Sequence, residues 1–97
     1  MISKDKTARA HILRMLNLCY PDELGINVII TGLAQVGLEF SEAEVRGHIV
    51  YLADKGYVRY REIKDPDSGL NILMVRLSAK GKDYHDGLLE SDPGIGV

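Results

Sequence analysis

Residues 40–58 read FSEAEVRGHIVYLADKGYV, and this stretch decides the fold. Ser41 is followed three residues later by Glu44, the spacing of a capping box, in which each side chain bonds the backbone amide of the other residue. Apolar residues then recur at helical spacing at Val45, Ile49 and Leu52. Gly56 follows, at a place where a left-handed residue commonly ends a helix. The pattern predicts a helix that buries one edge and offers the other outward.

Two further helices are predicted upstream of this segment. Residues 5–20 carry apolar side chains every three or four positions, at Ala8, Ile12, Met15, Leu16 and Cys19. Pro21 ends this helix, and residues 21–25 read as a loop. Residues 26–36 allow two interpretations, because the β-branched run from Val28 to Thr31 is compatible with a short strand. We favour a helix there, since the apolar residues have helical spacing and Gly37 can cap its end.

A β-hairpin and a fourth helix are predicted downstream. Residues 57–63 and 70–77 are rich in β-branched, aromatic and apolar side chains, and the Lys-Asp-Pro-Asp-Ser-Gly stretch between them has turn chemistry. Ser78 then caps a fourth helix that is expected to run to about Glu90. One domain over residues 1–90 is therefore expected, followed by a disordered tail over residues 91–97.

The order of these elements predicts a winged helix-turn-helix, a fold that is mainly α with a small β-hairpin. It has a three-helix core, a two-stranded wing and a C-terminal helix. Three short stretches resemble bacterial or phage regulators of the MarR and ArsR type, namely Lys-Gly-Tyr-Val at 55–58, Asp-Pro-Asp at 65–67 and VRLSAKGK at 75–82. The resemblance covers about residues 5–90 and implies a small transcriptional regulator that binds duplex DNA.

The resemblance also implies which residues contact DNA. Those expected to face the major groove are Ser41, Glu42, Ala43, Arg46, Gly47 and Val50. The expected wing contacts are Arg61 and Lys64. The chain departs from the MarR-type pattern at Leu70 and Asn71, where arginines are usual, and at Glu42, where a basic or hydroxyl residue is usual. An acid at that place repels phosphate unless it accepts a hydrogen bond from a cytosine amino group.

The same reasoning predicts how the chain binds DNA and with how many copies, and one alternative function stays open. A single weakly basic module gains affinity when two copies bind two half-sites, so we expect a homodimer formed through helices one and four. The net charge of -2 keeps a second interpretation open. In it, the fold is a protein-interaction module that docks a partner through the neutral face of the third helix and the apolar hairpin residues Leu70, Ile72 and Met74.

Other classes of function lack a signal in the sequence. Cys19 is the only cysteine, so neither an intrachain disulfide nor a cysteine-based zinc site is expected. The three histidines, His11, His48 and His85, have no metal-ligand spacing. Each acidic cluster has a structural explanation, and no nucleophile elbow or phosphate-binding glycine loop occurs. We therefore expect no catalytic residue, no metal and no cofactor. Without a secretory signal or a membrane-spanning run, a cytoplasmic protein is expected.

Overall fold

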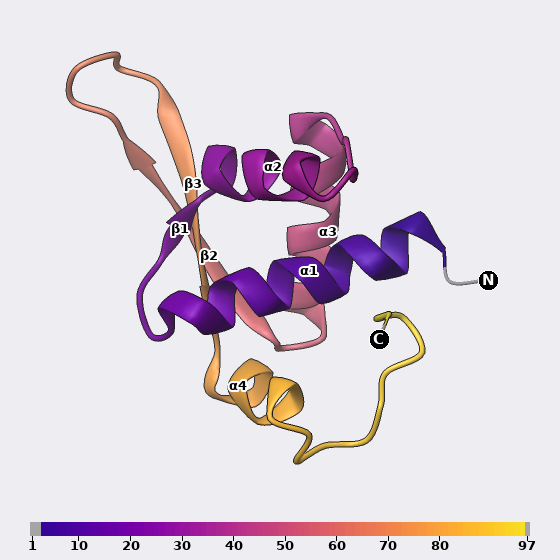
Figure 1. Ribbon diagram of the computed structural model, residues 1–97. Coiled ribbons are helices and arrows are strands. Elements are labelled where there is room, and N and C mark those ends of the chain that lie inside the picture. The colour runs from indigo at the N-terminus through magenta and orange to yellow at the C-terminus, as the bar shows by residue number, and fades with distance from the viewer. Residues whose placement is uncertain (1–2, 97) are drawn as a thin grey trace.

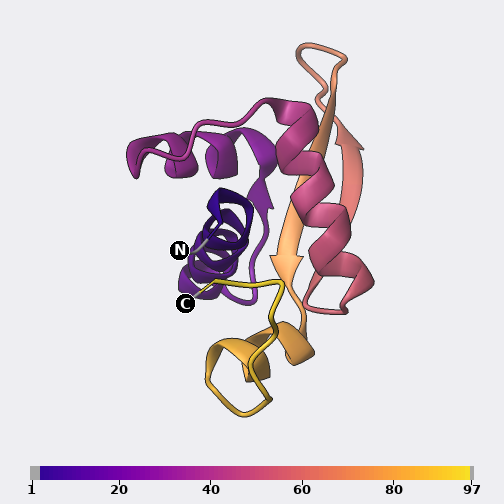
Figure 2. The same cartoon turned by 90° about the vertical axis from the view of Figure 1, so that its right-hand side faces the viewer.

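The structure is a computed structural model that describes residues 3–96. Its elements, in chain order, are α1 (Lys4–Cys19), β1 (Leu24–Gly25), α2 (Ile26–Gln35), α3 (Glu42–Asp54), β2 (Val58–Lys64), β3 (Asn71–Leu77) and α4 (Ala79–His85). The first three helices pack on one side of the small sheet, and the β2–β3 hairpin projects beyond them (Figures 1 and 2). Within the described residues, no helix is long and apolar enough to cross a membrane.

The third helix forms as the sequence predicts. The amide of Glu44 donates to Ser41 Oγ at 3.1 Å, and the amide of Ser41 donates to Glu44 Oε1 at 3.0 Å, which completes the capping box. Val45, Ile49 and Leu52 are fully buried. They join side chains of α1 and α2, such as Ile12 and Ile29, in one apolar core. The helix is thereby fixed along one edge, and its opposite edge is left at the surface.

The sheet has one strand more than expected. β1, only two residues long, pairs with β3 in antiparallel register, Leu24 opposite Val75 and Gly25 opposite Met74. The strand order is β1-β3-β2, so the hairpin strand β3 is central. A plain loop was expected over residues 21–25, and this was wrong for its last two residues, which form β1. Two residues are too few to show a strand pattern in the sequence, and their pairing depends on the position of β3.

A polar junction fixes the base of the hairpin to α4. Ser78 caps α4 by accepting from the amide of Gly81 at 2.9 Å, and its hydroxyl donates to the carbonyl of Gly56. The amide of Ser78 donates to the carbonyl of Tyr57 at 3.0 Å. Gly56 has a φ of 84°, which lets the chain turn sharply from α3 into β2. Gly56, Tyr57, Ser78 and Gly81 therefore have structural roles at this junction.

The fourth helix is shorter than the sequence predicts. It ends at His85 and not near Glu90. Gly87 has a φ of 80°, and its amide donates to the carbonyl of Tyr84 while the amide of Leu88 donates to that of Asp83. This left-handed glycine termination closes the helix after seven residues.

Residues 91–96 differ from the disordered tail that was expected, and Val97 lies outside the described residues. Ile95 is 7% exposed and belongs to the apolar core. Arg9 Nη1 donates to the carbonyl of Gly94 at 2.9 Å, and the amide of Gly96 donates to the carbonyl of Lys6 at 2.8 Å. The segment therefore returns to α1, as Figure 2 shows. A single apolar residue among glycines and polar residues gave too weak a pattern to indicate this packing.

Acid should release this segment, because Asp92 holds it as a carboxylate. The amide of Gly94 donates to Asp92 Oδ1 at 2.8 Å, which is the main reason that the pKa of Asp92 is below its usual value. The hydroxyl of Tyr57, whose pKa burial raises to about 12, donates to Oδ2 at 3.1 Å. An unfolded aspartate titrates near pH 3.9, so the stabilisation is complete above about pH 4 and is lost as the pH falls through the lower pKa of the folded state.

The measurement is an NMR titration of the Ile95 methyl groups and the Gly96 amide into acid. We expect both signals to move toward their unfolded positions below about pH 4. In Asp92→Asn this transition should disappear, because the side chain no longer titrates. Native Ile95 signals down to about pH 2 in the unsubstituted chain would contradict the assignment of this role to Asp92.

Candidate nucleic-acid interface

The outward edge of α3 carries the residues predicted to face a groove. Ser41, Glu42, Ala43 and Gly47 are exposed, Val50 is 42% exposed, and Arg46 is half-buried. Arg46 and Gly47 lie three and four residues after Ala43, and Val50 lies four and three residues after them, so the four residues form one stripe along the helix. The structure therefore brings these predicted residues together on a single surface. Within the stripe itself, Arg46 is the one long side chain.

Gly47 lies in the middle of this stripe without a packing reason. A Cβ added at Gly47 would meet no atom within 4 Å. Glycine inside a helix costs about 0.5–1 kcal/mol relative to alanine. The core of this protein therefore gains nothing from a glycine at this position, whereas a bare backbone allows a ligand to approach the helix closely.

Arg46 is held by two carboxylates, one from the preceding turn of α3 and one from the distant strand β2. Its Nη1 donates to Glu62 Oε1 at 2.9 Å, and its Nε lies 3.6 Å from Glu42 Oε2. Glu62 comes from β2, whose alternation places Glu62 on the α3 side of the sheet. Any anion that binds Arg46 therefore competes with these two acids. Among residues 3–96, the guanidinium of Arg46 contacts these acids through Nη1 and Nε. Both N–H groups of Nη2 are therefore left without a partner there.

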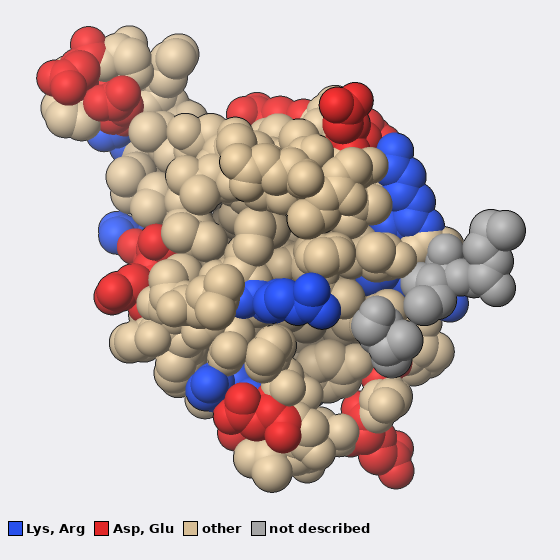
Figure 3. Space-filling model, viewed as in Figure 1, with Lys and Arg blue, Asp and Glu red and all other residues tan. Residues whose placement is uncertain are grey.

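The hairpin tip combines one predicted contact with acidic neighbours. Lys64 is exposed at the end of β2. Directly after it, Asp65 accepts from the amide of Asp67 at 3.1 Å and from the hydroxyl of Ser68 at 2.9 Å, and the first of these bonds is the main reason that the pKa of Asp65 is lowered. The acidic groups at the tip are visible at the upper left of Figure 3. Lys64 can reach an anion from this tip, but the acidic side chains beside it weaken its attraction for that anion.

Arg61 does not join the surface formed by Arg46. Strand alternation places Arg61 and Glu62 on opposite faces of β2, and the face with Arg61 points away from α3. Arg61 binds Glu23 with two hydrogen bonds, Nη2 to Oε1 at 2.7 Å and Nε to Oε2 at 2.9 Å. The two predicted cations of the hairpin are thus separated, with Lys64 at the tip and Arg61 on the outer face.

A partly buried cluster joins α3 to α1 through His48, for which the sequence indicated only that it lacks metal-ligand spacing. Arg9 stacks on Tyr51, with 3.8 Å between the guanidinium carbon and the ring centroid, and its Nε donates to His48 Nδ1 at 3.3 Å. Burial, and then the charge of Arg9, lower the pKa of His48. His48 lies three residues after Val45 and four before Leu52, both fully buried, and this spacing was a signal that it lies on the buried side of α3. Within residues 3–96, no group of three potential ligands could hold a metal ion.

Comparisons with solved structures decide the fold. A PadR-like transcription factor from Bacteroides fragilis has a TM-score of 0.66 and 18% identity, covering 82% of this chain and 74% of its own. Bacillus subtilis PadR in complex with operator DNA has a TM-score of 0.64 and 22% identity, covering 88% of this chain and 48% of its own. The circadian clock associated protein Pex from Anabaena has a TM-score of 0.66 and 18% identity, covering 90% of this chain and 74% of its own.

The fold is a winged helix. The predicted fold class is thereby confirmed, and PadR-like proteins are winged-helix regulators related to the MarR and ArsR types that the sequence resembles. In a winged helix, α3 occupies the place of the recognition helix and the β2–β3 hairpin is the wing. This chain spans about half the length of the Bacillus PadR chain. No profile of a known protein family matches the sequence, and no curated protein matches it.

Proposed function

We propose that this chain is a DNA-binding winged-helix domain that acts as a small transcriptional regulator. Its recognition helix α3 would enter the major groove, and Lys64 of the wing would contact the phosphate backbone. The observation that carries the proposal is the outward stripe of α3, which offers Arg46 between the small residues Ala43, Gly47 and Val50. The similarity of fold to a protein solved in complex with operator DNA supports it.

The chemistry of the stripe fits readout of a base edge. An arginine binds the O6 and N7 acceptors of guanine with two donors, and small neighbours permit the helix backbone to come close to the groove. Ser41, at the helix start, supplies a hydroxyl near the same edge. Glu42 and Glu62 hold Arg46 in the absence of DNA, so the specific complex has to replace or share those ion pairs.

Two copies would bind a palindromic site, because each copy offers few cations. We propose that the copies associate through α1 and α4, as the sequence analysis expects. The exposed apolar side chains near these helices support this arrangement, since Leu18 of α1 is 82% exposed and Leu88, which follows α4, is 71% exposed. Association of two copies would remove these apolar groups from water.

The experiment is a binding titration with mixed-sequence duplex DNA over a series of salt concentrations. We expect affinity to fall with salt, with a logarithmic slope of about -0.9 for each phosphate that is neutralised. A duplex selected from random sequences should then bind more tightly, with two chains per palindromic duplex. Negligible binding at low salt would contradict the proposal.

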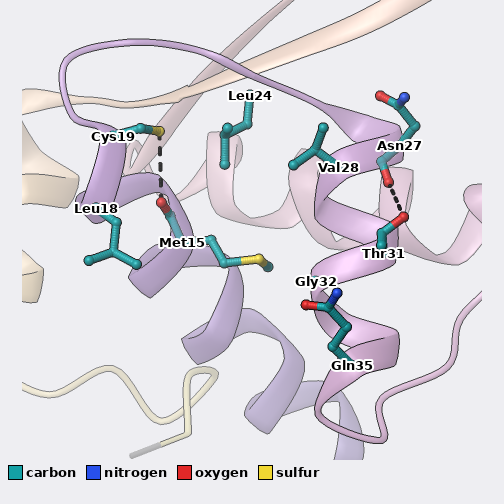
Figure 4. A pocket seen from close by; sticks show the side chains of 9 residues that line it. All are labelled: Met15, Leu18, Cys19, Leu24, Asn27, Val28, Thr31, Gly32 and Gln35. Carbon is teal, nitrogen blue, oxygen red and sulfur yellow. Dashed lines mark hydrogen bonds between the residues drawn. The ribbon is translucent and has the colours of Figure 1, made fainter.

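A protein partner is the second candidate, and an apolar groove between α1 and α2 favours it. The groove has a volume of about 490 Å³ and is lined by side chains that include Met15, Leu18, Leu24 and Val28 (Figure 4). Figure 3 shows that the face over α1 and α2 is covered mainly by uncharged side chains. Of the hairpin residues predicted for such docking, Leu70 is exposed, whereas Ile72 and Met74 are half-buried. Absence of DNA binding in the salt series would favour this candidate.

A further inference from the structure

An arginine cluster lies on the outer face of the sheet, away from α3. Arg59 and Arg61 alternate with the core-facing residues of β2, and Arg76 of β3 is directly opposite Arg59 in the antiparallel register. Residues directly opposite each other in such a pair project from the same face, with their Cβ atoms about 4.5–5.5 Å apart. All three arginines line one hollow of about 230 Å³, together with Glu23 and Tyr60.

The cluster has too few carboxylates for its arginines. Glu23 is its only acid, and both of its oxygens accept hydrogen bonds from Arg61, at 2.7 and 2.9 Å. Neither Arg59 nor Arg76 forms an ion pair or a side-chain hydrogen bond within residues 3–96. Like charges directly opposite each other on a sheet repel. Glu23, whose pKa is lowered mainly by its hydrogen bond with Arg61 and also by the charge of Arg76, offsets this repulsion only in part, because Arg61 binds both of its oxygens. The hollow carries a local charge of +2 on a protein whose net charge is -2.

We propose that Arg59 and Arg76 form a binding site for a dianionic phosphate, either inorganic phosphate or the phosphate group of a monoester. The planar guanidinium group matches the oxygens of a phosphate with two parallel hydrogen bonds. Two unpaired guanidiniums balance the charge of about -1.5 to -2 that a phosphate monoester carries at neutral pH. A phosphodiester, as in the DNA backbone, carries one charge and leaves the pair half neutralised. Arg61 stays with Glu23 and forms the wall of the site.

The site is separate from the DNA surface proposed above and does not depend on it. α3 and Glu62 lie on one side of the sheet, whereas Arg59, Arg61 and Arg76 lie on the other. A phosphate bound there would leave the stripe of α3 free. The protein would then carry two anion sites with different preferences, one for a duplex and one for a small dianion.

The test is an NMR titration of the ¹⁵N-labelled protein with inorganic phosphate at neutral pH and constant ionic strength, with chloride as the balancing ion. We expect saturable shifts of the backbone amides and arginine Nε signals at Arg59 and Arg76. The variant Arg59→Gln should weaken phosphate binding at least about tenfold, which corresponds to the loss of a charge-assisted pair. Arg14→Gln, which removes an exposed arginine of α1, should leave it unchanged.

Two further arms decide the class of ligand. Dimethyl phosphate, a monoanionic diester, should cause much smaller shifts, and a short duplex with hydroxyl ends should not displace bound phosphate. Shifts that are equal with phosphate and with chloride, or an unchanged affinity in Arg59→Gln, would overturn the proposal. Equal affinity for dimethyl phosphate, or displacement by the duplex, would overturn the assignment to a dianion. Because Arg59 is exposed, its variant is expected to fold, and its amide spectrum verifies this.

Discussion

Arg46→Ala should weaken binding to a selected duplex by about 1–3 kcal/mol, the usual contribution of an arginine that reads a guanine. Arg46 is the one basic side chain in the outward stripe of α3, and its Nη2 group keeps both donors while Nη1 binds Glu62. Removing the side chain takes away base-specific hydrogen bonds, so discrimination between sequences should fall along with affinity. The measurement is fluorescence anisotropy with the selected duplex and with a duplex of scrambled sequence.

Two control variants separate base readout from general charge effects. Lys64→Ala removes a wing cation and should weaken the selected and the scrambled duplex alike, with a smaller salt slope. Glu62→Gln removes the charge of one of the two acids that hold Arg46, so we expect stronger binding, and this gain should vanish when Arg46 is also replaced. If Arg46→Ala binds both duplexes as the unsubstituted chain does, α3 is not the reading element.

Gly81→Ala should destabilise the fold by about 3 kcal/mol, near the upper end of the usual cost of overpacking. A Cβ at Gly81 would overlap the carbonyl oxygen of Tyr57 and would lie 2.8 Å from Leu77 Cδ1. The carbonyl belongs to the backbone and already accepts the amide of Ser78, so it cannot move without breaking the junction between β3 and α4. The free energy of unfolding is measured by urea denaturation, followed by circular dichroism.

Gly47→Ala is the matched comparison, because it adds the same methyl group inside another helix. Nothing lies within 4 Å of the added atom, so this variant should gain about 0.5–1 kcal/mol of stability from helix propensity alone. The two substitutions should therefore move the urea midpoint in opposite directions. Equal midpoints for the two variants would show that the close approach at Gly81 is relieved by a shift of the backbone.

The elements that the sequence predicts well are those specified by neighbouring residues. The capping box, the helical spacing of Val45, Ile49 and Leu52, and the turn chemistry of residues 64–69 are local patterns, and the fold class follows from their order. The early end of α4 also had a local signal, because Gly87 stands where a left-handed residue can close a helix.

The features that the sequence did not reveal depend on contacts between distant residues. The strand β1 exists because Leu24 and Gly25 meet β3, about fifty residues later. Arg46 and Glu62, and likewise Arg61 and Glu23, are brought together only by the packing of the sheet. The α3 residues that are proposed to contact DNA do lie along its outward edge, but the ion pairs of Arg46, and the separation of Arg61 from it, required the three-dimensional fold. Whether those residues contact DNA stays a prediction.

The two-residue strand β1 has a mechanical consequence for how this protein can meet a ligand. Gly25 is hydrogen-bonded into the sheet opposite Met74, and α2 begins at the very next residue. The start of α2 is therefore tied to the central strand of the hairpin, and the two cannot separate without breaking that pairing. If the chain binds DNA as proposed, α3 and the hairpin contact the duplex at a spacing that this pairing helps to hold. A duplex whose groove and backbone do not match that spacing would then have to bend.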